Sequence, residues 1–142
     1  MKVFEAILMD MPKLPIGLEL TKKYVVRSED TAKFLGSGDV EVLSTPAMIA
    51  YMEHTALEAV QTYLLENLTT VGIRVDVKHL RPAPKGAEIT VVAKLIQQDR
   101  RKLVFEVKAF WNEDLIGEGI HERFIVDREK FLSKLRDKLG GR

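Results

Sequence analysis

The stretch that decides the fold is STPAMIAYMEHTALEAVQTYLL, residues 44–65. Ser44 or Thr45 can cap a helix, and Pro46 fits its first turn, where no amide donor is needed. The nineteen residues that follow Pro46 contain neither Gly nor Pro. The pattern therefore predicts one long helix that runs to a break near Asn67.

A carboxylate interrupts the apolar side of this helix. At about 100° per residue, one stripe collects five apolar residues: Ile49, Ala56, Leu57, Val60 and Leu64. Glu53 falls in the middle of that stripe. An ionised carboxylate that faces a core is costly unless it is paired or hydrogen-bonded, so we expect a partner for Glu53 elsewhere in the chain.

The rest of the chain predicts a sheet and a second helix. Stretches with the apolar alternation of strands are residues 18–26, 71–80, 88–98, 102–112 and 115–126. Residues 28–43 are predicted to be a loop whose Gly-rich part, 35–39, is mobile, and residues 128–139 are predicted to be a polar amphipathic helix. This order predicts a single α+β domain over 1–142, in which the four strands from residue 71 to residue 126 form an antiparallel meander and the sheet buries one face against the long helix.

One polar residue also interrupts the strand pattern of 71–80. The alternation places His79 on the same face as four apolar residues, Val71, Ile73, Val75 and Val77. This face and the helix stripe should oppose each other, which makes His79 the expected partner of Glu53. Such a pair can simply satisfy itself in a core, or it can perform general acid–base or nucleophilic chemistry; the pattern supports both interpretations equally.

Thr45 has a structural and a functional interpretation. It can be the helix N-cap, or its hydroxyl can position an anionic or carbonyl oxygen at the helix start. Eight residues of helix span about 12 Å, so Thr45 and Glu53 of one chain cannot touch if both lie on it. Either Thr45 lies off the helix or the site combines two chains, which favours a dimer.

His54 and His121 lack metal-ligand spacing and are predicted to be surface or structural residues.

Composition excludes several functional classes. A net charge of +1 gives no general attraction to nucleic acid or anionic membrane, and the chain has no cysteine for disulfides or thiolate sites. We find no signal-peptide pattern, no membrane-spanning run, no nucleotide-binding motif and no metal motif, and expect a cytoplasmic protein. Four basic residues could meet a phosphate-bearing ligand at the sheet edge, or could simply be solvated: Arg74, Lys78, Arg81 and Lys85.

Three segments together resemble one family. The segments STPAMIAYMEHTALEAV (44–60), VGIRVDVKHLRPAPKG (71–86) and GEGIHERFIVDREKF (117–131) are similar to the fluoroacetyl-CoA thioesterase-like group of the hotdog fold, in which a curved antiparallel sheet wraps a central helix. The resemblance implies a catalytic set of Thr45, Glu53 and His79. It also implies that the amide of Gly72 helps to hold the thioester carbonyl.

The resemblance also implies an enzymatic function, but the chain differs from the family in its lid segment. It implies an acyl-CoA thioesterase, at least dimeric, that needs no cofactor beyond the CoA of its substrate. Members selective for fluoroacetyl-CoA carry two lid phenylalanines, where this chain has Gly36 and Asp39, with Phe34 the one aromatic residue nearby. The resemblance therefore does not extend to selectivity for the fluoroacetyl group. Phe34, Arg74 and Arg81 are predicted to contact the substrate.

Two other functions remain open at this point. A non-catalytic acyl-CoA-binding module on the same fold would bind CoA esters without turnover. A hotdog hydratase or dehydratase would need an acidic residue and a His on the helix with suitable spacing. His54 follows Glu53 directly and lies about 100° away around the helix, which disfavours the hydratase.

Overall fold

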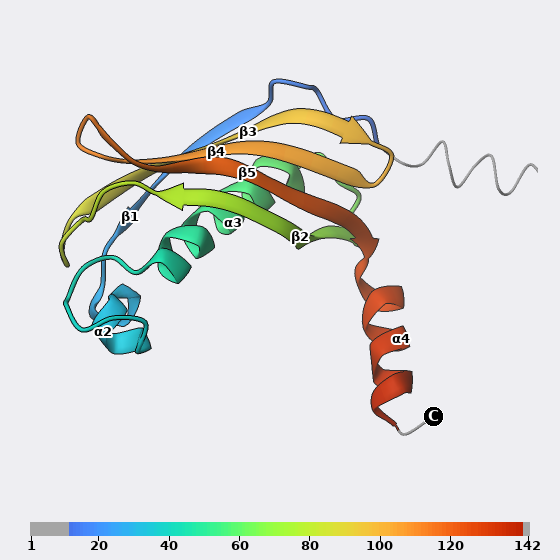
Figure 1. The fold of residues 1–142 in the computed structure, drawn as a ribbon. Coiled ribbons are helices and arrows are strands. Elements are labelled where there is room, and N and C mark those ends of the chain that lie inside the picture. Colours follow the sequence, from blue (N-terminus) through green and yellow to red (C-terminus); the bar gives the residue numbers. More distant parts are fainter. Residues whose placement is uncertain (1–11, 141–142) are drawn as a thin grey trace, which may run out of the picture.

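The computed structural model describes residues 12–140, which form an antiparallel sheet curved around one central helix (Figure 1). The elements in chain order are β1 (Glu19–Val25), the short 3-10 helix η1 (Ser28–Asp30), α2 (Ala32–Leu35), α3 (Thr45–Gln61), β2 (Leu68–His79), β3 (Glu88–Asp99), β4 (Lys102–Trp111), β5 (Asp114–Asp127) and α4 (Arg128–Leu139). This arrangement is the hotdog fold, so the predicted fold class is confirmed.

The five strands are ordered β1-β3-β4-β5-β2, and each neighbouring pair is antiparallel. The strands β3, β4 and β5 form a meander, and β1 and β2 are the two edges. The predicted meander of four strands is wrong for β2, which pairs with β5 and not with β3. The sheet face toward α3 carries fully buried side chains at alternate positions of the central strands: Ile89, Val91, Ala93, Leu95, Leu103, Phe105, Val107 and Ala109. The burial of this face holds the sheet to the helix.

The helix α3 begins where the sequence predicts and ends earlier. The Ser44 side chain accepts a hydrogen bond from the Ala47 amide at 3.1 Å, so Ser44 is the N-cap. The helix ends at Gln61 rather than near Asn67, and the Tyr63 amide bonds the Val60 carbonyl in a tighter last turn. Four residues of the predicted helix are therefore turn and loop before β2.

The buried face of α3 differs from the predicted stripe. The helix buries Met48, Met52, Thr55, Ala56, Ala59 and Val60 most deeply. Glu53 and Leu57 lie at the flank and are partly exposed, so the prediction that Glu53 lies mid-stripe is wrong. Because α3 carries apolar residues on almost every side, its periodicity leaves the orientation undetermined, and packing against the sheet decides it.

A β-bulge changes the faces of β2. Its register with β5 passes from Gly72 directly to Arg74 and skips Ile73. Residues opposite each other across a ladder point to the same side of a sheet. Val75 lies opposite the buried His121, whereas Val71 lies opposite the partly exposed Phe124. The predicted single face for all the valines of this strand is therefore wrong: the bulge separates Val71 from the His79 side.

The segment between β1 and α3, predicted to be a loop, contains the two short helices η1 and α2. Asp30 fixes this segment to α3, because its carboxylate accepts hydrogen bonds from the Tyr51 hydroxyl at 2.7 Å and from the Arg27 guanidinium. Burial raises the pKa of Asp30, but these hydrogen bonds outweigh burial, and the pKa lies below its usual value. The segment is thus anchored beside the first half of α3.

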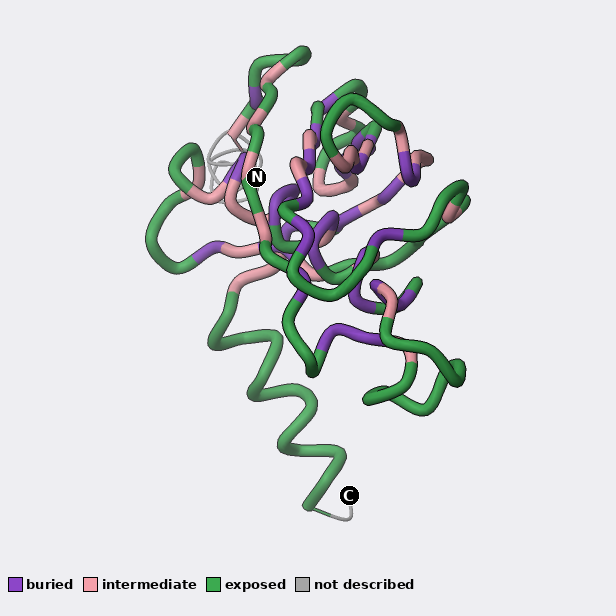
Figure 2. The backbone as a smooth tube through the Cα atoms, turned by 90° about the vertical axis from the view of Figure 1, so that its left-hand side faces the viewer, coloured by how far each residue is buried: buried purple, intermediate pink, exposed green. Residues whose placement is uncertain are grey.

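The C-terminal helix α4 matches its predicted range and projects away from the sheet (Figure 1). The Asp127 side chain caps it by accepting a hydrogen bond from the Lys130 amide. The helix is exposed along its length (Figure 2). No helix within residues 12–140 is long and apolar enough to cross a membrane.

Candidate functional site

Thr45 and His79 form a hydrogen-bonded pair between the start of α3 and the end of β2. Thr45 Oγ1 and His79 Nδ1 lie 2.8 Å apart. Because Ser44 caps the helix, the Thr45 hydroxyl is free for this contact, and the interpretation of Thr45 as the N-cap is wrong. The two residues are thirty-four positions apart in the sequence, so only the tertiary fold brings them together.

The second nitrogen of His79 has no partner. Among the described residues, His79 Nε2 is the one buried side-chain nitrogen or oxygen without a hydrogen bond. Burial lowers the pKa of His79, and the backbone of Arg81 offsets part of this effect. The imidazole is therefore neutral near pH 7. A neutral imidazole with one free nitrogen can accept or relay a proton.

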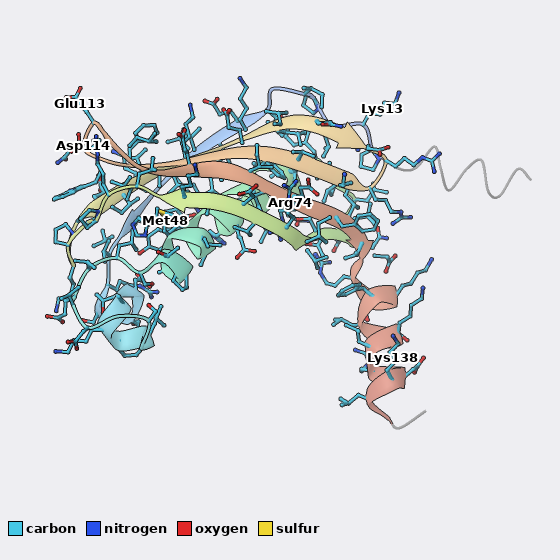
Figure 3. All side chains as sticks on the ribbon, in the orientation of Figure 1. Lys13, Met48, Arg74, Glu113, Asp114 and Lys138 are labelled. Atoms are coloured by element: carbon cyan, nitrogen blue, oxygen red, sulfur yellow. The ribbon has the colours of Figure 1, made fainter. Side chains whose placement is uncertain are left out.

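A glycine permits the approach of α3 to His79. Gly117 on β5 lies opposite His79 in the ladder. A Cβ at residue 117 would lie 2.5 Å from Met48 Sδ and 2.7 Å from Met48 Cε, so Met48 occupies the space of a side chain there. Figure 3 shows Met48 between α3 and the sheet. Because Met48 is one turn beyond Thr45, this contact brings the Thr45 hydroxyl to His79.

Glu53 lies against Gly72, not against His79. A Cβ at residue 72 would lie 2.8 Å from Glu53 Oε2, so the carboxylate rests on the backbone of β2 at its bulge. Among residues 12–140, Glu53 makes no hydrogen bond or ion pair that fixes its oxygens. The carboxylate thus lies against the backbone of β2 and remains available to a ligand.

His121 and Arg123 complete this second cluster. Arg123 was not predicted from the sequence, whereas His121 was predicted to be a surface or structural residue and is buried. A Cβ at residue 72 would lie 3.3 Å from His121 Cε1 and 3.5 Å from Arg123 Nη1. Arg123 is buried, and its guanidinium donates to Thr70 Oγ1 at 2.7 Å, to the Thr70 carbonyl at 2.9 Å and to His121 Nε2 at 3.1 Å. Burial lowers the pKa of Arg123, and the nearby Glu53 carboxylate offsets part of this effect.

The tautomer of His121 follows from its partners. The Arg74 carbonyl can only accept, so His121 Nδ1 donates to it at 2.8 Å. The Arg123 guanidinium can only donate, so Nε2 accepts. His121 is therefore neutral, and burial followed by the charge of Arg123 accounts for its lowered pKa, which the Arg74 carbonyl opposes. The local sequence RFIV, residues 123–126, does not indicate that Arg123 is buried beside Glu53.

The other predicted substrate residues are placed differently. Phe34 on α2 is 67% exposed. Arg74 lies on β2 (Figure 3) and is paired with Glu122 at 3.0 Å. Arg81 lines a pocket of about 440 Å³ beside Thr45 and His79, and it approaches Asp114 at 3.5 Å. Arg81 is therefore the one of these three that adjoins the Thr45–His79 pair.

Thr45–His79 and Glu53–Gly72 form two half-sites of the same chain. Eight residues separate Thr45 from Glu53 on α3, which is about 12 Å along the helix axis. A neutral imidazole with a free nitrogen can relay a proton, and a carboxylate can act as a base or a nucleophile. Hydrolysis of an activated carbonyl compound can use both kinds of group.

The sequence comparisons agree with this chemistry. Residues 26–129 match the family model for fluoroacetyl-CoA-specific thioesterase. The fluoroacetyl-CoA thioesterase of Streptantibioticus cattleyicolor is 32% identical over 129 residues, which cover 87% of this chain and 93% of that protein.

Solved structures of thioesterases are also similar to this chain. A solved fluoroacetyl-CoA thioesterase is 31% identical and superposes with a TM-score of 0.83, covering 89% of this chain and 98% of that one. A threonine-to-serine variant of such an enzyme has been solved with acetyl-CoA. A hypothetical protein of Thermus thermophilus, described as a thioesterase superfamily member, is 29% identical with a TM-score of 0.80 and coverages of 92% and 98%.

Proposed function

Because the chain belongs to the fluoroacetyl-CoA-specific thioesterase family, we propose that it hydrolyses a small or medium acyl-CoA thioester to the free acid and CoA. The observation that carries this proposal is the position of Glu53 Oε2 on the backbone of Gly72, with the carboxylate unbonded. Thr45, Glu53 and His79 are the proposed catalytic residues. The proposed site needs no metal or redox cofactor.

The proposed reaction uses each group in turn. In one route Glu53 takes a proton from a water molecule, whose oxygen bonds to the thioester carbonyl carbon as the bond from carbon to sulfur breaks. In the other route the Glu53 carboxylate attacks that carbon itself, the bond from carbon to sulfur breaks, and water then hydrolyses the resulting anhydride. His79 and Thr45 relay a proton to the departing sulfur, and the Gly72 amide and the start of α3 stabilise the carbonyl oxygen.

We further propose that the complete site combines two chains. The edge strand β2 is twelve residues long, and its exposed apolar residues Ile73 and Val75 are 51% and 40% exposed. A long apolar edge strand is a liability unless it is covered. Antiparallel pairing of β2 with its copy about a two-fold axis would bring His79 of one protomer toward Gly72 of the other. Thr45 and His79 would then face Glu53 of the partner subunit.

The segment before α3 distinguishes this chain from members that are selective for fluoroacetyl-CoA. Members that are selective for fluoroacetyl-CoA have two lid phenylalanines where this chain has Gly36 and Asp39. Gly36 is the left-handed C-cap of α2, with φ of 75°, a backbone conformation that a phenylalanine adopts only with strain. We therefore propose a substrate other than fluoroacetyl-CoA. We also propose a cytoplasmic location, where CoA thioesters are formed and consumed.

The test is thiol release from a panel of short, branched, aromatic and long acyl-CoAs. We expect turnover of at least one ester by the wild type, and a loss of about 10²- to 10⁴-fold in kcat for Glu53→Gln. The matched control is Glu58→Gln on the same helix, whose carboxylate instead pairs with Lys22 and His54. This control should keep its activity.

Two results would favour the other functions. Tight binding of a CoA ester without hydrolysis of any panel member would identify a binding module. Hydration of an enoyl-CoA without thiol release would identify a hydratase. Near-normal turnover by Glu53→Gln would remove Glu53 from the proposed chemistry.

A further inference from the structure

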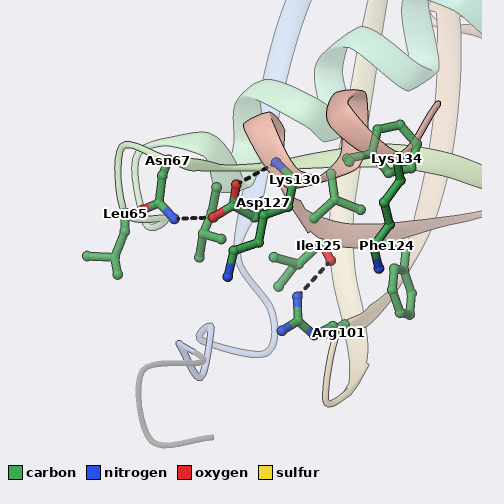
Figure 4. A pocket seen from close by; sticks show the side chains of 11 residues that line it. Leu65, Asn67, Arg101, Phe124, Ile125, Asp127, Lys130 and Lys134 are labelled. Carbon is green, nitrogen blue, oxygen red and sulfur yellow. Dashed lines mark hydrogen bonds between the residues drawn. The ribbon is translucent and has the colours of Figure 1, made fainter. Parts of the chain in front are cut away.

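We propose that a basic pocket where α4 meets the sheet binds the 3′-phosphorylated ADP part of the acyl-CoA substrate, an inference that rests on the proposed function. The pocket has a volume of about 480 Å³ and lies between the end of β5, the start of β2 and α4 (Figure 4). Its size is in the range of small-ligand sites. Most of α4 lies outside the matched residues 26–129, so this wall of the pocket is not part of the family model.

Three cations line the pocket, and none of them forms an ion pair with a carboxylate in residues 12–140. Arg101 comes from the β3–β4 hairpin, and Lys130 and Lys134 come from α4. Lys130 and Lys134 are four residues apart, so they project from the same side of the helix. The pocket therefore holds positive charge that an anionic ligand can neutralise.

The one carboxylate of the pocket is already engaged. Asp127 accepts hydrogen bonds from the Lys130 backbone amide at 3.1 Å and from the Asn67 side chain at 2.9 Å (Figure 4). Its two oxygens cap α4 and hold the turn before β2, so its charge is committed to the helix N-terminus. The side-chain ammonium groups of Lys130 and Lys134 remain for a phosphate.

The basic residues at the sheet edge are less suited to phosphate. Arg74 pairs with Glu122 at 3.0 Å, Arg81 with Asp114 at 3.5 Å, and Lys85 with Glu41 at 3.7 Å. Phosphate binding there would have to displace a carboxylate in each case. Of the four basic residues expected there, Lys78 alone forms no ion pair in residues 12–140, whereas the pocket beside α4 brings three such cations together. We therefore place the phosphate site in that pocket.

Two aromatic rings complete the pocket. Phe124 on β5 and Phe131 on α4 both line it, and each is 37% exposed. A flat base such as adenine can stack on an aromatic side chain. Stacking surfaces beside cations match a ligand with an adenine at one end and phosphates near it.

The pocket and the Glu53–Gly72 cluster are connected by strand β2. Leu68, which lines the pocket, precedes Gly72 by four residues on that strand. Four residues of strand span about 13 Å, a distance that the extended pantetheine arm of CoA can bridge. A neighbouring pocket shares Arg101 and Phe124, and together the two pockets contain six cationic residues and two acidic ones.

The experiment compares two esters of the same acid. Steady-state kinetics are measured on the acyl-CoA and on the acyl N-acetylcysteamine thioester, which lacks the nucleotide. For the double variant Lys130→Ala with Lys134→Ala, we expect KM for the CoA ester to rise about tenfold at unchanged kcat. The kcat/KM for the short thioester should not change. Alanine keeps the helix propensity of α4.

The matched control is Lys138→Ala, which removes the same charge from the same helix. Lys138 lies at the far end of α4 and does not line the pocket (Figure 3). Its KM for the CoA ester should stay near that of the wild type. An equal rise for Lys138→Ala, or the same change on both esters, would overturn the proposal.

Direct binding separates this proposal from the proposed function. Adenosine 3′,5′-bisphosphate and 3′-phospho-ADP are titrated calorimetrically into the wild type and the double variant. Weaker binding of 3′-phospho-ADP by the double variant supports the nucleotide site whether or not the wild type hydrolyses either ester. Absence of hydrolysis of both esters would refute the proposed thioesterase activity and leave the nucleotide site standing. Equal affinity of both proteins, or no binding by either, would refute the nucleotide site while thiol release still supports the thioesterase.

Discussion

Glu53 Oε2 occupies the space that a side chain on residue 72 would need, 2.8 Å from the position of its Cβ. The carboxylate therefore depends on a glycine in a different element for its place. The contact lies at the bulge of β2 and beside the buried guanidinium of Arg123. A helix residue and a strand residue thus define one half of the proposed site together.

The variant Gly72→Ala tests this dependence. The new methyl group would push the Glu53 carboxylate from its position, and a displacement of about 1 Å can lower catalysis about 10²-fold. We expect kcat to fall by about one to two orders of magnitude, with little change in the melting temperature because the displaced atom ends a flexible side chain. Thiol-release kinetics and thermal unfolding measure both, and Val71→Ala is the neighbouring control. Unchanged kcat would show that the position of Glu53 is not critical.

Replacements of Ser44 and Thr45 separate capping from chemistry. Thr45→Val removes the hydroxyl that bonds His79 and should lower kcat by at least about tenfold, whereas Thr45→Ser should keep most of the activity. Ser44→Ala removes the cap and should lower the free energy of unfolding by about 1 kcal/mol. Urea unfolding and thiol release are measured on all three variants. A stability loss in Thr45→Val as large as that in Ser44→Ala would assign Thr45 a capping role.

Mixing two inactive variants tests the two-chain site. Glu53→Ala and His79→Ala each remove one half-site, so neither dimer alone should hydrolyse the substrate. If subunits exchange at random, half of the dimers contain one Glu53→Ala chain and one His79→Ala chain. Each of these mixed dimers has two sites, of which one is complete. We expect roughly a quarter of the wild-type activity to return after unfolding and refolding the mixture. Recovery of no activity would place all three residues of each site in one chain.

The pH dependence of stability should report His121 together with His79, because burial lowers the pKa of both imidazoles. Burial, together with the charge of Arg123, holds the folded-state pKa of His121 below its usual value of 6.5. The unfolded chain therefore binds the proton first, and the free energy of unfolding falls as the pH drops below about 6.5. The buried Asp30 contributes its own loss only below about pH 4, since its pKa is lowered from 3.8.

Urea unfolding of the wild type and His121→Gln at pH 7, 6 and 5 measures this effect. The variant can keep both hydrogen bonds of His121 but cannot titrate, so its stability should fall less between pH 7 and pH 5. His54→Gln is the control, because His54 is exposed and pairs with Glu58 on the surface. Parallel pH profiles for the wild type and His121→Gln would show that another group titrates.

The contact of Tyr51 with Asp30 should stabilise the segment before α3. Tyr51→Phe removes the 2.7 Å hydrogen bond to a buried carboxylate and should lower the free energy of unfolding by about 1–3 kcal/mol. Burial and the neighbouring Asp30 raise the pKa of Tyr51, so the hydroxyl stays protonated. Tyr63→Phe, at an exposed tyrosine, is the matched control in urea unfolding. Equal stability of the two variants would show that the anchor adds nothing.

Sequence alone determined the five strands, the start of α3 and the helix α4. The alternation of apolar residues in β3 and β4 and the start of α4 after Asp127 are local patterns, and the structure confirms them. Residues of one strand or one helix turn lie within a few positions of each other, so their spacing reports their common face. The resemblance of the helix and strand motifs also identified the family.

Tertiary structure alone decided how the site is assembled. The bulge at Ile73, the pairing of Thr45 with His79, and the burial of Arg123 beside Gly72 depend on contacts between residues far apart in the chain. Periodicity placed Glu53 in the core and paired it with His79, because α3 is apolar on almost every side and a bulge leaves no mark on a run of alternating residues. Only the packing of the helix on the sheet sets its rotation, and that rotation places Glu53 on Gly72.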